Sequence, residues 1–126
     1  MNLEELLNKS SEMELEVEDI LKYCNGNDLS YVEFSNNVLV HLAKIYLSGS
    51  VDYSYADGVA NNIHDFMMTD QYLDSNNNTL SDPAYSIYLA FDAGEYYRKE
   101  DDKSIEPHIK YTNPELEAIL RGIENS

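Results

Sequence analysis

The strongest constraint on the fold is an apolar stripe with helical spacing between residues 31 and 48. Its members recur at intervals of three, four and seven residues, which places them on one face of a helix: Val32, Leu39, Leu42, Ile45 and Tyr46. Ser30 followed by Glu33 has the pattern of a capping box, in which each side chain accepts a free N–H at the helix start. Gly49 follows the last apolar residue, as at many helix ends. The sequence therefore predicts a helix over residues 31 to 48.

A second stripe indicates another helix directly downstream. Ser54 with Asp57 repeats the spacing of the capping box, and the apolar residues that follow extend the helix to about Thr69. Upstream, apolar residues between positions 3 and 23 predict one or two further helices. The run Cys24-Asn25-Gly26-Asn27 ends that region.

Two proline signals predict the remaining helices. Asp82-Pro83 fits an N-cap followed by proline in the first turn, and Asn113-Pro114 repeats it. We expect the first of these helices to cover residues 83 to 100. No segment alternates apolar and polar residues between hairpin turns. The prediction is an all-α fold, an irregular bundle of five or six helices in one domain over residues 1–126.

The helix predicted over residues 83 to 100 has two different faces. One carries Ala84, Ile87, Tyr88, Phe91, Gly94 and Arg98, which we assign to the core, with Gly94 at a close approach between helices. The other combines aromatic and acidic residues, and acids follow it. We predict that this surface binds a partner through Tyr85, Leu89, Asp92, Glu95, Tyr96, Glu100, Asp101 and Asp102. Alternatively, the tyrosines pack beneath the last helix.

The charge balance restricts the partner. The 126 residues include 24 acids and 8 lysines or arginines, a formal net charge of -16. Nucleic acid and anionic lipid would be repelled, whereas a basic protein would be attracted at low salt. Acidity that serves only solubility is the alternative. Apolar runs are too short to span a membrane and the N-terminus is acidic, so we expect a cytoplasmic protein without a signal peptide.

One loop partly resembles a calcium site. Asp74, Asn76, Asn78 and Asp82 have the spacing of the first ligands of an EF-hand loop. Thr79 then stands where the turn needs glycine, and Tyr85 where a bidentate glutamate belongs. We therefore expect an ordinary polar loop.

A metal-dependent phosphohydrolase of the HD type is a further hypothesis. His41, the pair His64-Asp65, and Asp92 occur in the order of that pattern, on three predicted helices. An HD pair arises easily by chance in so acidic a chain, and no basic cluster is available for a substrate phosphate. Cys24 is the only cysteine and is expected to be a buried thiol rather than a nucleophile. We predict no catalytic residues, no metal and no cofactor.

A small, acidic, tyrosine-rich helical chain resembles the bacterial immunity proteins that neutralise colicins or contact-dependent toxins. The resemblance is one of size, charge and helicity, without an alignable motif. Tyr96-Tyr97 is followed by Arg98, whereas colicin DNase immunity proteins carry a Tyr-Tyr-Pro signature, so their binding residues cannot be transferred. The resemblance implies an inhibitor that docks on a basic nuclease toxin. A DNA mimic that inhibits a nucleic-acid-binding protein is the closest alternative.

Overall fold

The computed structural model describes residues 1–125, and all of its regular elements are helical. This confirms the all-α class, while the expected count of five or six helices is too low because the N-terminal region forms two helices and a short one follows α4. The described part of the chain contains seven α-helices and one π-helical turn. They are α1 (Leu3–Ser11), α2 (Val17–Gly26), α3 (Tyr31–Leu47), α4 (Tyr53–Met67), α5 (Asp70–Ser75), α6 (Ala84–Ala93), the π-helix η1 (His108–Thr112) and α7 (Asn113–Glu124).

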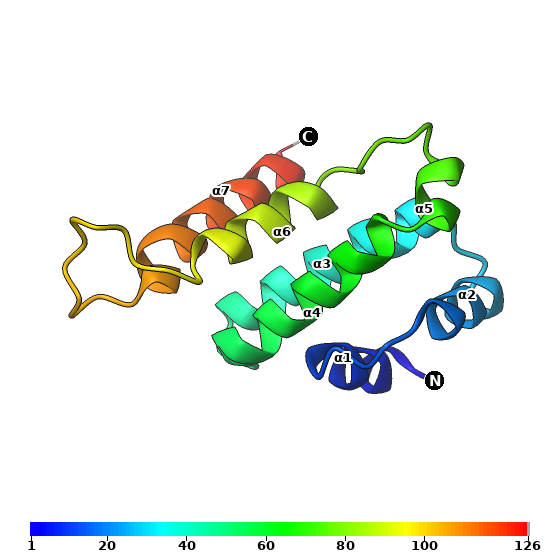
Figure 1. Ribbon diagram of the computed structural model, residues 1–126, viewed down its shortest axis with the longest axis horizontal. Coiled ribbons are helices and arrows are strands. Elements are labelled where there is room, and N and C mark those ends of the chain that lie inside the picture. Colours follow the sequence, from blue (N-terminus) through cyan, green and yellow to red (C-terminus); the bar gives the residue numbers. More distant parts are fainter. Residues whose placement is uncertain (126) are drawn as a thin grey trace.

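The helices are arranged around α3 and α4, which lie in the middle of the molecule (Figure 1). α6 and α7 pack together on one side of this pair, and α1 packs on α4 from the other. The core is built from their inward stripes, and its largest fully buried side chains include Phe34, Leu39, Leu42, Ile63 and Phe91. The helical spacing in the sequence therefore identifies most of the core.

Helix starts agree with the sequence at α3 and differ at α4, α6 and α7. α6 begins at Ala84 with Pro83 as its N-cap, so Asp82 is not the N-cap that the sequence predicted. At α3, the Ser30 hydroxyl accepts from the Glu33 N–H at 3.0 Å, and the Glu33 carboxylate accepts from the Ser30 N–H at 3.1 Å. The cap of α4 is Asp52, which accepts from the Tyr55 N–H at 2.8 Å, so the assignment of Ser54 is wrong. Asn113 is no N-cap either, because η1 leads directly into α7 and the Asn113 amide oxygen accepts the Tyr46 hydroxyl.

α6 ends at Ala93, seven residues before the predicted end of the helix at residue 100. Tertiary hydrogen bonds occupy the carbonyls of its last turn. Thr112 Oγ1 donates to the Ala90 carbonyl at 2.7 Å, the Tyr53 hydroxyl donates to the Phe91 carbonyl, and Arg98 donates to the Ala93 carbonyl at 2.6 Å. These donors replace the N–H groups of a further turn, so the chain leaves the helix.

Gly94 makes the predicted close approach, although at the end of α6 and against η1. A Cβ at this position would lie 2.1 Å from Thr112 Oγ1 and 2.8 Å from His108 Cα. Both distances are far below a van der Waals contact, so only glycine fits here without a shift of η1.

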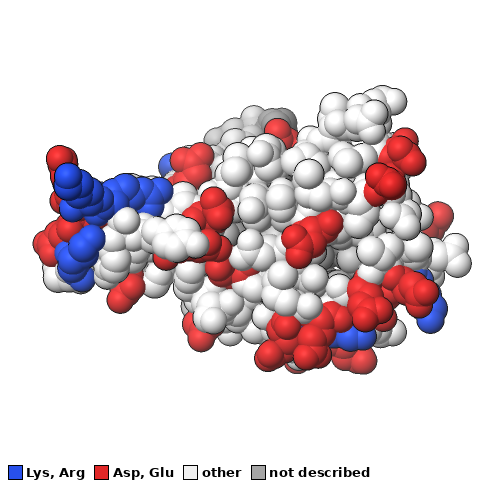
Figure 2. Space-filling view, viewed as in Figure 1, with Lys and Arg blue, Asp and Glu red and all other residues white. Residues whose placement is uncertain are grey.

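The chain between α6 and η1 forms a loop over residues 94–107 that projects beyond the helices (Figure 1). Asp101 organises it by accepting hydrogen bonds from the Arg98 N–H at 2.7 Å, Lys110 Nζ at 2.8 Å and the Tyr111 hydroxyl at 2.6 Å. Arg98 is exposed, not in the core as predicted, and its guanidinium carbon lies 3.7 Å from the centre of the Tyr111 ring. Lysines and arginines gather on this projection (Figure 2).

None of the helices within residues 1–125 combines the length and the apolar composition that a membrane crossing requires.

Candidate functional site

The predicted partner-binding surface is divided between a helix and a loop. Tyr85, Leu89 and Asp92 lie on α6, whereas Glu95, Tyr96, Glu100, Asp101 and Asp102 lie in the 94–107 loop. Because α6 stops at Ala93, these eight residues do not form one helix face. Whether they contact a partner stays a prediction.

Acids and bases are equal in number between residues 98 and 110, and one of the acids, Asp101, forms an ion pair there. The Asp101 side chain is only 5% exposed and pairs with Lys110, and the hydrogen bonds from Lys110, Tyr111 and the Arg98 backbone hold the pKa of that carboxyl well below its usual range. Four of the chain's eight bases fall between residues 98 and 110, and this is the basic projection of Figure 2: Arg98, Lys99, Lys103 and Lys110. The loop is therefore not the acidic surface that its sequence suggests.

Four further acids without a basic partner lie on or next to α4 and α6. We call Asp57 and Asp65 of α4, Asp92 of α6 and the adjoining Glu95 the α4–α6 carboxylates. The ion pairs of the described residues are Lys9–Asp19 and Lys110–Asp101. No lysine or arginine among those residues thus pairs with any of the four carboxylates.

Two of these carboxylates are in direct contact. The Glu95 carboxyl lies close enough to the Asp57 carboxyl to favour the protonated form of Asp57. Asn61 Nδ2 donates to Glu95 Oε2 at 3.2 Å, and the Tyr53 hydroxyl lies 3.4 Å from Asp57 Oδ1. Burial, followed by the contact with Glu95, raises the pKa of Asp57 to about 7. The pair therefore holds a proton near neutral pH, as expected for adjacent acids without a cation.

Aromatic rings continue the same surface. The His64 ring stacks on the Tyr88 ring with 3.8 Å between centroids and 6° between planes. The centroid of the Tyr85 ring lies 6.2 Å from that of His64. Burial lowers the pKa of His64, against the opposing effect of Asp65 and Asp92. Tyr85 and Tyr88 are half-buried, whereas Leu89 is 44% exposed. The surface thus combines acids with accessible aromatic and aliphatic groups.

The metal hypothesis lacks an assembled ligand set. His41 lines a different groove, beside Lys44 and Pro83, whereas His64 stacks on Tyr88. Within residues 1–125 no three His, Cys, Asp or Glu side chains converge closely enough to hold a metal ion. The polar loop expected in place of a calcium site is closed by its own bonds, with Asn76 Nδ2 donating to the Thr79 carbonyl and Asp82 accepting from the Ser86 N–H.

Cys24 is buried, as predicted. Burial raises the pKa of its thiol to about 11, so the thiolate needed for nucleophilic chemistry is scarce at neutral pH.

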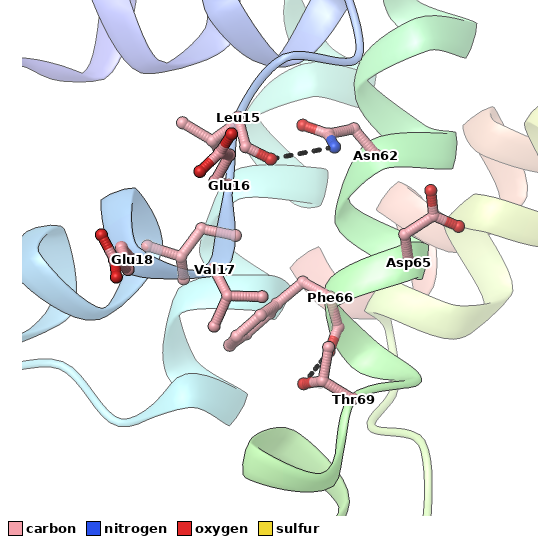
Figure 3. A pocket seen from close by; sticks show the side chains of 9 residues that line it. Leu15, Glu16, Val17, Glu18, Asn62, Asp65, Phe66 and Thr69 are labelled. Carbon is pink, nitrogen blue, oxygen red and sulfur yellow. Dashed lines mark hydrogen bonds between the residues drawn. The ribbon is translucent and has the colours of Figure 1, made fainter.

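A second cleft separates the start of α2 from α4 (Figure 3). Asn62 reaches from α4 to the linker that precedes α2 and donates its Nδ2 to the Leu15 carbonyl at 3.2 Å. Val17 and Phe66 form apolar walls below this bond. Asn62 therefore fastens the N-terminal helices to α4.

Sequence reasoning missed Asp57 and Asp65 as members of the acidic surface. Asp57 was assigned to a helix cap and Asp65 to a metal motif, although both lie on the helix that faces α6. Their four-residue spacing to Asn61 and Thr69 was the available signal of a polar stripe on α4.

Comparisons with protein-family models, curated proteins and solved structures gave no significant match.

Proposed function

We propose that this chain is a protein-binding inhibitor that docks its α4–α6 surface on a basic partner, in the manner of an immunity protein that neutralises a nuclease toxin. A nuclease needs lysine and arginine to hold phosphate, so its substrate groove has the charge that this surface complements. Blocking that groove or a neighbouring site would prevent nucleic acid from binding.

The observation that supports the proposal best is the absence of a cation beside the α4–α6 carboxylates. In the described residues, three of these carboxylates lie on the packed helices α4 and α6 and the fourth, Glu95, follows α6, whereas the two ion pairs are elsewhere. Leaving like charges together costs free energy that a partner's basic side chains would recover. A surface built only for solubility would gain nothing from placing Asp57 against Glu95.

The neighbouring tyrosine rings of α6 would slow dissociation of the complex. Tyrosines bury a large area with little loss of side-chain entropy, and residues of this type dominate binding energy at the centres of interfaces. Tyr85, Tyr88 and the exposed Leu89 lie beside Asp92 on α6. We expect the carboxylates to accelerate association and the α6 side chains to slow dissociation.

The test uses the full chain, immobilised and exposed to a panel of purified basic nuclease toxin domains at low salt. For a domain that binds, association rates are measured with the double variant Asp65→Lys and Asp92→Lys. The control is Glu117→Lys with Glu124→Lys, which makes the same change in net charge on α7. We expect the first pair to slow association at least about tenfold and the control to have a much smaller effect, and the bound toxin to lose nuclease activity.

Equal rates for the two double variants would show that only net charge matters and would refute this surface as the docking site. Failure of every basic domain to bind, or binding without loss of nuclease activity, would refute the inhibitor function.

A further inference from the structure

A cleft with mixed aromatic and acidic walls lies at the base of the 94–107 loop. It opens where the start of α4 faces the chain on either side of that loop, and its lining includes three carboxylates and three aromatic rings: Asp52, Glu95, Glu106, Tyr53, Tyr97 and His108. None of the side chains that line it is a lysine or an arginine. We call it the α4–η1 cleft.

The rings are held in place before any ligand arrives. His108 stacks on Tyr53 with 4.6 Å between centroids and 14° between planes, and the Tyr53 hydroxyl is fixed to the Phe91 carbonyl. Tyr97 donates its hydroxyl to the Lys103 carbonyl at 3.1 Å, and Lys103 Nζ lies 4.4 Å from the centre of the Tyr97 ring. A cation of the chain thus already rests on one ring of the cleft, which shows that this ring attracts positive charge.

The carboxylates differ in how they are used within the chain. Asp52 caps α4, and Glu95 is held by Asn61 against Asp57. Glu106 is exposed, and its side chain accepts no hydrogen bond from the other described residues. Glu95 and Glu106 therefore present carboxylate oxygens near the rings without a cation between them.

We propose that the α4–η1 cleft binds an arginine side chain of the partner protein. A guanidinium group is planar, so it can stack on a tyrosine or histidine ring while it donates paired N–H bonds to a carboxylate. An ammonium group would match the charge but not the flat walls. This inference rests on the proposed function only in taking the partner to be a basic protein, and it adds the residue type and the position of its contact.

Binding would be coupled to a proton. Asp57 faces Glu95 from the loop, Asp92 from α6 and Tyr53 on its own helix, and His108 of η1 stacks on that tyrosine. Each nearby carboxylate favours the protonated form of Asp57, whereas a guanidinium beside Glu95 would favour the ionised form. An arginine in the cleft therefore lowers the pKa of Asp57, and binding near pH 7 releases a proton.

The experiment uses N-acetyl-arginine amide as the probe, titrated into the isotope-labelled full chain and followed by NMR. N-acetyl-lysine amide and N-acetyl-norleucine amide are the comparisons. We expect the arginine probe to shift the amides of Gly94, Glu95 and His108 at millimolar concentration, more strongly than the lysine probe and unlike norleucine. The carboxyl resonance of Asp57 should titrate at least about half a pH unit lower when the probe is present.

Two variants that each remove one carboxylate charge from the cleft test whether the arginine probe binds there. Glu95→Gln and Glu106→Gln should each weaken the probe's binding several-fold, and Glu106→Gln leaves the Asn61 and Asp57 contacts intact. Glu117→Gln removes one acid from the exposed face of α7 and should bind the probe like the parent chain. Shifts spread over all acidic surfaces, or equal weakening by the three variants, would overturn the proposal.

The two proposals fail in different ways. If a basic toxin binds through Asp65 and Asp92 but the arginine probe does not bind in the α4–η1 cleft, the arginine site is wrong and the inhibitor function stands. Should the probe bind in the cleft while no basic protein does, the guanidinium site stands without the inhibitor function.

Discussion

Asp57 illustrates how a single residue acquires a property that its sequence position does not disclose. It lies on α4, half-buried, with the Glu95 carboxyl against it and Asp92 nearby. Burial is the largest cause of its raised pKa, since water no longer stabilises the ionised form, and the neighbouring carboxylates act in the same direction. The residue therefore stores unfavourable electrostatic energy at neutral pH.

This energy predicts a pH dependence of stability. The pKa of Asp57 is raised to about 7 in the folded chain from an ordinary value of 3.8, so the folded state binds the additional proton between these pH values. The contribution of Asp57 to the free energy of unfolding must then fall as pH rises through this window. We expect Asp57→Asn to reduce the fall between pH 5 and pH 8 by about 1 kcal/mol, after allowance for solvent screening, as measured by urea denaturation.

Glu117→Gln is the control for this measurement, since it removes a carboxylate from the exposed side of α7. The hydrogen-bonded acids Asp19, Glu33 and Asp101 have lowered pKa values, so their contribution is lost only in more acidic solution. The lowered pKa of His64 acts in the opposite direction but is common to both chains, so an equal change of stability between pH 5 and pH 8 in the parent chain and in Asp57→Asn would contradict the shared proton.

At the scale of elements, the start of α3 was predictable because its signals are local. Ser30 and Glu33 are three residues apart and satisfy each other's backbone groups in any helix that begins there. The end of α6 was not predictable, because its last carbonyls accept from Thr112 and Tyr53, which are distant in sequence. A helix boundary fixed by tertiary donors leaves no local pattern.

Gly94 gives a direct test of this junction. An added methyl group would collide with Thr112 Oγ1 and with the His108 backbone, so η1 would have to move. We expect Gly94→Ala to lower the free energy of unfolding by about 2 kcal/mol or more, with faster hydrogen exchange in η1.

Gly122→Ala is the matched control, because no atom lies within 4 Å of a Cβ at that position on α7. Alanine favours the helix, so this variant should be neutral or up to about 1 kcal/mol more stable. Similar effects of the two substitutions, measured by thermal and urea denaturation, would show that Gly94 is not tightly packed.

The whole molecule has an uneven charge distribution that its total does not reveal. Half of its eight bases lie between residues 98 and 110, beside the acids of the projecting loop, whereas the rest of the chain is strongly acidic (Figure 2). The eight residues predicted to bind a partner are accordingly divided between α6 and the projecting loop, and their role in binding stays a prediction. Tyr85, Leu89 and Asp92 share the helix α6, whereas Asp101 accepts hydrogen bonds from Lys110 and Tyr111.

The net charge predicts a salt dependence of stability. A formal charge of -16 on 126 residues repels itself in the compact state, and salt screens exposed charges beyond about 10 Å at 0.1 M. We expect the melting temperature to rise by several degrees between 20 mM and 500 mM NaCl. The triple variant Glu14→Gln, Glu117→Gln and Glu124→Gln neutralises exposed acids and should show a smaller rise. A melting temperature that is independent of salt would mean that repulsion is unimportant.

The sequence by itself determined the helical class, the core stripes and the overall acidity, because each depends on residue type and on spacing within a few turns. Ser30 at the start of α3 and the buried Phe91 of α6 are of this kind. Only the tertiary structure decided where α6 stops, which acids are paired and which are left together. Those outcomes depend on groups such as Asp57 and Glu95, which are separated in the sequence and are brought into contact when α4 packs against α6.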